Sequence, residues 1–503
     1  MKFCNSLRFT FVVFTLAFVV NGAQSQQSPV KGLDQYIEKA MKDWETPGLA
    51  IAIVKEDKVV FAKGYGVRKM GETARVTEKT IFGCASTTKA MAASCIGMLV
   101  DDGKLSWDDP VTKHLPWFQL YDPYVTRELT VRDLLCHRSG LARGDMIWYQ
   151  SPYDRKEVVK RVRYLKPSWS LRSHYGYQNI MYITAGEVVE AVAGKSWDEF
   201  IKERLFKPLG MTSTTTSTKE LSRFEDVATH HVKIDEKFQP IPWPNYDNVG
   251  AAGTVNSNVM DYAQWIRLNL GKGMIEGKRI LGEKTIEEMH TPHTIIPLDS
   301  LTKVLYPSMH FASYGLGWTL RDYLGRKLIQ HDGALDGMRA RVTLVPEEKL
   351  GFVILLNSSN GQLHGAIGYR ILDHYMGAPE KDWNSVQLKL AKESEEKAKA
   401  EEKKKEESRA KNTKPSLLLE KYAGTYEHEM YGELKISELS GALVTNFYPA
   451  FVGDLKHWQH DAFQVIWKDR NLDKEFFTFT LTSDGKVDML KWEGLGDFKR
   501  NEK

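Results

Sequence analysis

The stretch FGCASTTKAM, from Phe82 to Met91, places a serine three residues before a lysine, at Ser86 and Lys89. The residues that follow, AMAASCIGMLVDDG, repeat apolar groups at helical spacing and stop at Gly103, which predicts an amphipathic, largely buried helix of about four turns. Three residues make about one helical turn, so the two side chains are expected on the same face. The positive end of the helix would also stabilise a negative charge on the serine oxygen. The segment therefore indicates a serine nucleophile beside an amine.

The Ser-x-x-Lys pattern is weak by itself, because it begins at six different serines of this chain. The alternative is that Ser86 or Thr87 only caps the helix and that Lys89 is solvated. A serine hydroxyl becomes a good nucleophile only when a base removes its proton. A lysine can be that base only if burial or neighbouring positive charge lowers its pKa. The interpretation of Ser86 therefore depends on groups elsewhere in the chain.

Tyr177 and Asn179 are the first candidate partners. They lie in a glycine-containing loop just before a long helical pattern that starts at about residue 181. A tyrosinate held beside ammonium groups can act as a base, and the asparagine amide can bridge a lysine and a substrate carbonyl. The same Tyr-x-Asn spacing occurs at Tyr246 and Asn248, so a purely structural role is the alternative.

The segment LIQHDGALDGMRA, from Leu328, supplies the other candidates, His331 and Gly333. A glycine in a strand permits close approach of a substrate backbone. The next amide, Ala334 N–H, could form half of an oxyanion hole together with the amide of Ser86. The alternative for His331 is that of a structural histidine.

Several longer segments together resemble the serine β-lactamase-related family. FGCASTTKAMAASCIGMLVDDGKLSWDDPVTKHLP, TVRDLLCHRSGL, YGYQNIMYITAGEVVEAVAGKSWDEFIKERLFKPLGMTSTT and HDGALDGMRA follow the order and approximate spacing of class C type β-lactamases, penicillin-binding proteins, D-aminopeptidases and esterases. The resemblance spans roughly residues 33 to 375. It implies an α+β, β-lactamase/transpeptidase-like fold, with an antiparallel sheet flanked by helices and a helical lobe.

The resemblance also assigns roles to the candidate residues. The three motifs of the family fall on Ser86 and Lys89, on Tyr177 and Asn179, and on His331 and Gly333. They imply acylation of Ser86, proton transfer by Lys89 and Tyr177, and release of the acyl group to water. Which of Lys89 and Tyr177 is the base stays open. No metal and no cofactor is implied.

One departure from the family pattern bears on the substrate. The third motif of lactamases and many peptidases is Lys-Thr-Gly, whereas this chain has His331-Asp332-Gly333, and histidine occurs there in esterase and aminopeptidase relatives. Asp332 adds negative charge where a substrate carboxylate is usually held. We therefore expect a small-molecule or peptide substrate with a neutral or cationic ester or amide, and a peptidase- or esterase-like activity instead of a true β-lactamase.

Composition changes along the 503 residues predict four segments. Residues 1–25 read as a signal peptide, with a basic start, an uncharged run over residues 9–20 and small residues after it. They predict secretion with no membrane segment after cleavage, and a retained anchor is the alternative. Residues 26–384 form the hydrolase domain. Residues 385–414 form a charged, solvated helical linker, or alternatively a partner-binding tail. Residues 415–503 alternate as short strands, which predicts a small antiparallel barrel or sandwich.

Smaller features limit the partners and the covalent chemistry. The net charge of +4 gives no reason to expect nucleic acid. Cys84, Cys95 and Cys136 remain after signal cleavage, either as one bridge and a free thiol or as three buried thiols. The sequon at Asn357 predicts N-glycosylation of a secreted chain.

A second, weaker resemblance is to secreted animal β-lactamase-like proteins of the mollusc shell matrix, the gigasin type. It implies an extracellular matrix component that keeps the fold with incidental or no activity. Mineral binding would favour long acidic runs, but the linker carries nine basic and seven acidic residues between Lys389 and Lys411. A third alternative is a binding module that acylates slowly or never.

Overall fold

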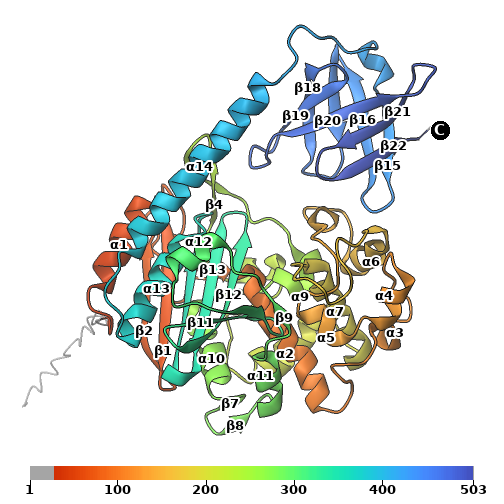
Figure 1. Ribbon diagram of the computed structural model, residues 1–503. Coiled ribbons are helices and arrows are strands. Elements are labelled where there is room, and N and C mark those ends of the chain that lie inside the picture. Colours follow the sequence, from red (N-terminus) through yellow and green to blue (C-terminus); the bar gives the residue numbers. More distant parts are fainter. Residues whose placement is uncertain (1–27, 502–503) are drawn as a thin grey trace, which may run out of the picture.

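The first three quarters of the chain form one large antiparallel sheet with helices around it (Figure 1). The structure, a computed structural model, describes residues 28–501. The predicted signal peptide, residues 1–25, lies outside the described residues. Among the described helices, none combines the length and apolar character that a bilayer crossing requires.

The central sheet has eight strands in the order β2-β1-β14-β13-β12-β11-β10-β9. Their bounds are β1 (Gly48–Lys55), β2 (Lys58–Gly66), β9 (Thr294–Ile295), β10 (Ala312–Tyr314), β11 (Thr319–Tyr323), β12 (Arg326–Leu335), β13 (Met338–Val345) and β14 (Leu350–Leu356). In the sequence, apolar runs on either side of a charged turn predict hairpins over residues 48–66 and 341–357, and the pairs β1–β2 and β13–β14 confirm them. β14 is buried at every position because helices cover both faces of the sheet.

Two layers of helices cover the sheet. α1 (Leu33–Asp43) and α13 (Leu363–Met376) pack on one face, and α10 (Val259–Leu270) packs on the other against β1 and β14. The helical lobe and its connections contain the other elements of this domain. They are α2 (Thr88–Asp101), α3 (Val111–His114), α4 (Pro123–Glu128), α5 (Val131–Leu135), α6 (Arg155–Arg161), α7 (Asn179–Ala193), α8 (Trp197–Ile201), α9 (Gly250–Gly253), α11 (Glu283–Met289) and α12 (Ser300–Leu305), with the strand pairs β3 (Phe82–Gly83) with β6 (Asn256–Ser257), β4 (His230–Ile234) with β5 (Lys237–Ile241) and β7 (Met274–Ile275) with β8 (Lys278–Arg279).

The helix that follows Ser86 differs from its prediction in one respect. α2 was expected to be amphipathic, but every residue from Thr88 to Leu99 is buried. The reason is that α7, α9 and α11 all pack around it. α2 is therefore a central helix of the domain, and its N-terminal turn is held from several sides.

The charged segment near residue 400 is helical, as predicted, but the helix begins earlier. α14 (Trp383–Glu407) buries Trp383, Asn384 and Gln387 in its first turns, and its remainder is mainly exposed. Trp383 stacks on Tyr306 with 5.3 Å between ring centroids. The predicted boundary between residues 384 and 385 thus falls inside a continuous helix whose start is anchored on the hydrolase domain.

The C-terminal part is a closed eight-stranded barrel, which confirms the predicted small β domain. Its strands are β15 (Gly424–His428), β16 (Gly432–Leu439), β17 (Ala442–Asn446), β18 (Val452–Gln459), β19 (Ala462–Trp467), β20 (Glu475–Leu481), β21 (Val487–Trp492) and β22 (Gly496–Arg500). Aromatic side chains such as Phe463, Phe477 and Phe498 are buried in its core.

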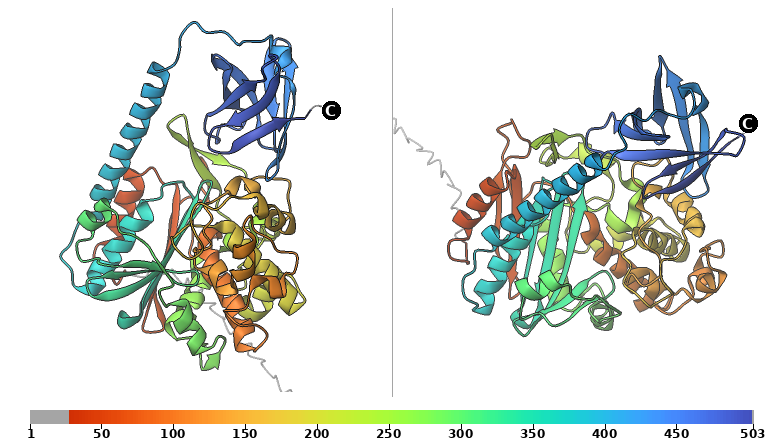
Figure 2. Two further views of the ribbon diagram at one scale, coloured as in Figure 1. Left: turned by 45° about the vertical axis from the view of Figure 1, so that its right-hand side comes forward. Right: turned by 45° about the horizontal axis from the view of Figure 1, so that its top comes forward.

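The barrel rests on the helical lobe, on the side reached by α14 (Figure 2). Tyr153 Oη donates to the Tyr431 carbonyl at 3.1 Å. Arg161 donates to the carbonyls of Glu429 and Met430 at 3.3 Å each. These contacts fix the loop between β15 and β16 against α6 and the segment before it.

Two expectations about covalent chemistry have outcomes here. Cys84, Cys95 and Cys136 are all free and buried, in agreement with the three-thiol alternative. The glycosylation expectation at Asn357 is wrong for the folded chain. Asn357 is fully buried, and its Nδ2, the atom that would carry a glycan, donates to the carbonyls of Val67 and Arg68 at 3.2 and 2.9 Å.

Candidate active site

Ser86 lies on a short 3-10 turn, Ala85–Thr87, between β3 and α2. Pairing of β3 with β6 fixes one side of this turn, and Cys84 N–H donates to the Val255 carbonyl at 2.9 Å. Ala85 has a φ of 51°, a left-handed conformation that costs energy for a residue with a side chain. The surrounding structure therefore holds Ser86 in one orientation at the start of a buried helix.

Gly333 on β12 explains how the turn can come so close to the sheet. A Cβ on Gly333 would overlap the Cys84 carbonyl oxygen and would lie 3.0 Å from the Ala85 Cβ. Glycine was expected here to admit a substrate backbone. Its first physical role is instead to admit the turn that carries Ser86.

Lys89 points back from α2 to Ser86 and is fully buried, so it is not a solvated lysine. Its Nζ lies 3.0 Å from Ser86 Oγ, 2.7 Å from Asn179 Oδ1 and 2.8 Å from the Ala252 carbonyl oxygen. Burial lowers the pKa of Lys89 well below its usual value, and the smaller effects of Asp145 and Arg143 oppose each other.

The partners of Lys89 fit a neutral amine. A carbonyl oxygen and an amide oxygen can only accept hydrogen bonds, so Ala252 and Asn179 take the two N–H groups. The remaining lone pair then faces Ser86, whose hydroxyl can donate. This is the arrangement in which Lys89 could accept the serine proton.

Asn179, the first residue of α7, owes its orientation to Asp145. Its Nδ2 donates to Asp145 Oδ1 at 2.9 Å, and Trp148 Nε1 donates to the same oxygen at 2.8 Å. Asp145 was not singled out in the sequence. The second Tyr-x-Asn does not join the site, because Asn248 Nδ2 donates to the carbonyls of Trp148 and Tyr153.

Tyr177 is half-buried beside the serine. Its ring centroid lies 4.9 Å from Lys89 Nζ and 4.9 Å from Arg143 Cζ. Burial raises the pKa of the Tyr177 phenol well above its usual value, although the hydrogen bond with Ser86 lowers it. At neutral pH the phenol is therefore protonated, and it is better suited to donate a proton than to accept one first.

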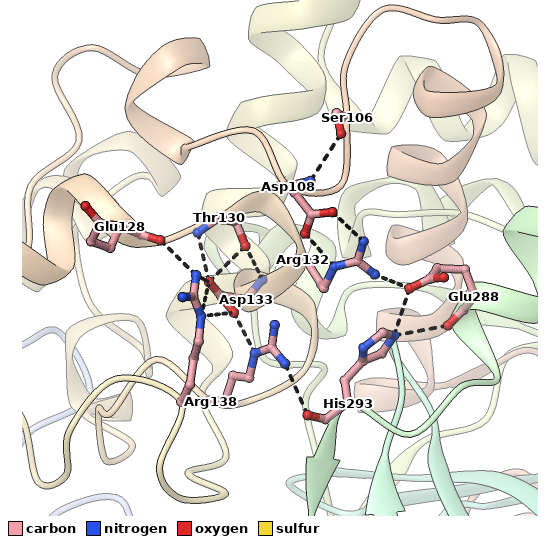
Figure 3. A network of polar contacts seen from close by, with 10 residues as sticks. Ser106, Asp108, Glu128, Thr130, Arg132, Asp133, Arg138, Glu288 and His293 are labelled. Carbon is pink, nitrogen blue, oxygen red and sulfur yellow. Dashed lines mark hydrogen bonds and ion pairs between the residues drawn. The ribbon is translucent and has the colours of Figure 1, made fainter.

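An ionic network around the buried carboxylate of Asp133 holds the two loops that bring these groups together (Figure 3). Asp133 on α5 is fully buried and accepts hydrogen bonds from Arg138 and Arg172. Arg138 also donates to the His293 carbonyl at 3.2 Å, and Arg172 N–H donates to the Arg138 carbonyl at 2.7 Å. The loop after α5 and the loop that leads to Tyr177 are thereby joined at one carboxylate.

His331 reaches the site, but both of its ring nitrogens are occupied. Nδ1 donates to the Asp332 carbonyl at 2.6 Å, and Nε2 accepts from Tyr314 Oη at 2.7 Å. Burial lowers the pKa of His331 to about 4, so the ring is neutral at physiological pH. His331 therefore has no free nitrogen with which to deprotonate Ser86, and it positions the end of β12 and Tyr314.

His137 packs against Tyr177, and it was not singled out in the sequence. Its Nδ1 accepts from Gln178 N–H at 3.1 Å, and its ring lies 4.3 Å from the ring of Tyr177 and 4.5 Å from that of Tyr314. Within residues 28–501 its Nε2 has no hydrogen-bond partner. His137 thus holds the Tyr177 ring and the backbone next to it in position. An isolated histidine carries no sequence signal that could have revealed this role.

Ser86, Tyr177, Asn179, His331, Gly333 and Ala334 all line one pocket of about 570 Å³. Asp332 also faces it, but Arg341 binds both of its carboxylate oxygens at 2.6 and 2.7 Å. Arg321 and Arg339 line the same wall, and among the described residues neither has an ion-pair partner within 4 Å. The expectation that Asp332 makes the pocket favour neutral or cationic substrates is therefore wrong, because its charge is already paired.

Comparisons with known proteins agree with this fold. The family model described as beta-lactamase matches residues 33–376, and a domain of unknown function named DUF3471 matches residues 408–503. An unguisins hydrolase of Aspergillus campestris is 29% identical over 80% of this chain and 76% of its own length. The octameric penicillin-binding protein homologue from Pyrococcus abyssi superposes with a TM-score of 0.65 at 24% identity, covering 94% of this chain and 100% of that one. A D-stereospecific amidohydrolase from Streptomyces sp. superposes with a TM-score of 0.56 at 21% identity, over 70% of this chain and 100% of that one.

Proposed function

Because the chain belongs to the beta-lactamase family, we propose that it is a serine hydrolase that cleaves an ester or amide through an acyl-enzyme on Ser86. The observation that carries the proposal is the buried contact of Lys89 with Ser86, at 3.0 Å, with its two other neighbours restricted to accepting. A relative of this chain is also named as a hydrolase.

In the proposed mechanism, Ser86 Oγ bonds to the substrate carbonyl carbon while its proton passes to Lys89 Nζ. The amides of Ser86 and Ala334 stabilise the oxyanion. The bond between the carbonyl carbon and the leaving group then breaks, while the protonated Tyr177 gives its proton to the leaving group and regains one from Lys89, so that the amine is neutral again. Water next attacks the acyl carbon and gives one proton to Lys89. The ester bond to Ser86 breaks, and that proton passes to Ser86 Oγ as the acid leaves.

The substrate class and location complete the proposal. The His331-Asp332-Gly333 motif favours a peptidase- or esterase-like activity over a true β-lactamase. The leader-like residues 1–25 support secretion into the extracellular space. Arg321, which has no ion-pair partner within 4 Å among the described residues, leaves room in the pocket for a substrate with an anionic group.

The test is intact-mass analysis after treatment with a fluorophosphonate. We expect one adduct on the wild-type protein and none on Ser86→Ala. The matched control is Ser300→Ala, since Ser300 also begins a Ser-x-x-Lys pattern but lies on the exposed helix α12. If the folded wild-type protein takes up no label, then Ser86 is not nucleophilic. An extracellular matrix component or a binding module would then be the preferred interpretation.

A further inference from the structure

A second, smaller chamber adjoins the pocket that holds Ser86. It has a volume of about 200 Å³, and it shares Trp148, Tyr149, Ala334 and Arg339 with the first pocket. Since a water molecule occupies about 30 Å³ in the liquid, the chamber has room for one large side chain and not for a second ligand. Ala334 lines both pockets, and its own amide would face the reacting carbonyl.

The walls of the second chamber are mainly aromatic and aliphatic. They include Trp148, Tyr149, Val232, Tyr246 and Leu335. The rings of Tyr149 and Tyr246 have centroids 6.5 Å apart, and Trp148 lies edge-on to Tyr246 at 6.5 Å. A pocket with such walls binds an apolar or aromatic group most favourably, because binding removes that group from water.

The one acidic group of the chamber is already satisfied. Asp336 Oδ2 accepts from Tyr149 Oη at 2.6 Å and from Tyr246 Oη at 2.7 Å. The guanidinium of Arg339, which also lines the chamber, supplies the opposite charge. The chamber therefore carries no net charge that would favour a cationic or anionic ligand.

The barrel also contributes to the chamber. Asn471, in the loop after β19, belongs to its lining, although it lies more than a hundred residues beyond the other wall residues. Arg470 in this loop forms an ion pair with Asp235, and Phe451, just before β18, brings a second part of the barrel against Tyr149, at 6.1 Å between ring centroids. The C-terminal domain thus contributes directly to the substrate cleft.

We propose that the second chamber is a specificity subsite that takes an uncharged aromatic or large apolar side chain of the substrate, next to the scissile carbonyl, and that the barrel completes it through Asn471. This inference rests on the proposed function for its placement beside Ser86. The binding step itself does not need catalysis, so the two can be tested apart.

The experiment measures equilibrium binding to the full-length Ser86→Ala protein by ligand-observed NMR. The probes are N-acetylphenylalaninamide, N-acetyllysinamide and N-acetylglycinamide. We expect the phenylalanine amide to bind about tenfold more tightly than the other two, because one aromatic side chain leaves water. Equal affinities, or a preference for the lysine amide, would overturn the proposal.

Variants assign the preference to the chamber. Asn471→Trp fills it from the barrel and Val232→Phe fills it from β4, and each should reduce the phenylalanine-to-glycine ratio to about one. Lys468→Trp is the matched control, because Lys468 is exposed on the same loop and does not line the chamber. An unchanged ratio in both filled variants would place the preference elsewhere. Fluorophosphonate labelling of the wild-type protein, run in parallel, reports separately on the proposed nucleophile.

Discussion

The hydrogen-bond partners of Lys89 set the protonation state on which the proposed chemistry depends. Lys89 Nζ has two neighbours that can only accept and one, Ser86, that can also donate. Burial then disfavours the ammonium form, and the pKa of Lys89 lies well below its usual value. The rate of Ser86 labelling should therefore fall at low pH, as Lys89 gains a proton.

A single substitution tests this interpretation at the residue scale. Asn179→Asp places a carboxylate about where the Asn179 Oδ1 now lies, 2.7 Å from Lys89 Nζ. An adjacent negative charge favours the ammonium form and raises a lysine pKa by about 1–3 units. The acid limb of the pH–labelling profile should move to higher pH by a similar amount, and labelling at a pH on that limb should drop about tenfold or more.

The control makes the same charge change away from the site. Asn245→Asp alters an exposed residue whose side chain contacts its own loop. Its profile should match that of the wild-type protein. If Asn179→Asp lowers labelling equally at every pH, then Lys89 is not the group that titrates.

The proximity of the candidate residues was predictable from the sequence, but their chemical states were not. Ser86, Lys89, Tyr177, Asn179, His331 and Gly333 line or border one pocket. The sequence could not show that His331 has both nitrogens occupied, or that Arg341 pairs with Asp332 from the neighbouring strand. Those facts depend on cross-strand neighbours and on burial, which motif spacing does not encode.

At the scale of elements, the contact between β12 and the Ser86 turn is the tightest part of the site. Gly333→Ala would force its Cβ into the Cys84 carbonyl, so the turn or the strand must shift. We expect a loss of about 1–3 kcal/mol in the free energy of unfolding and a larger, at least tenfold, loss in labelling rate. Chemical denaturation and labelling kinetics measure the two effects.

Gly253→Ala is the matched control for this substitution. Gly253 also faces the Ser86 turn, but its added Cβ would meet the nearest atoms at 3.6 and 3.8 Å, which is ordinary contact. Both measurements should stay close to wild type. A Gly333→Ala protein that labels at the wild-type rate would show that the turn tolerates displacement.

Elements with strong local patterns were predicted well, whereas those fixed by distant partners were not. The hairpins over residues 48–66 and 341–357 carry their own alternation and turn residues. α2 was predicted as amphipathic because sequence shows only the helix, while burial on all sides comes from α7, α9 and α11. The early start of α14 likewise depends on Trp383 finding Tyr306.

At the scale of the whole molecule, the barrel is held on the helical lobe by a small number of specific contacts. Arg161 lies over the Tyr153 ring, with Cζ 4.2 Å from the centroid, and reaches two carbonyls of the loop between β15 and β16. Gly432 follows that loop with a φ of 83°, and a Cβ there would overlap the Tyr153 hydroxyl. The contact between the barrel and the helical lobe is therefore sensitive to single substitutions at Arg161 and at Gly432.

Arg161→Ala and Gly432→Ala should each loosen the barrel without unfolding it. The first removes a cation–π contact and two hydrogen bonds, worth about 1–3 kcal/mol together, and the second introduces an overlap. Hydrogen exchange should become faster in residues 429–432 and 149–153, and small-angle scattering should show a larger maximum dimension.

Arg163→Ala is the control, since Arg163 Nε donates only to the Lys160 carbonyl on its own helix. Labelling of Ser86 should persist in all three variants, because the side chains that contact Ser86 and Lys89 precede residue 260. If exchange and dimensions match the wild type in both test variants, then α14 and the connection after it, not this loop, hold the barrel in place.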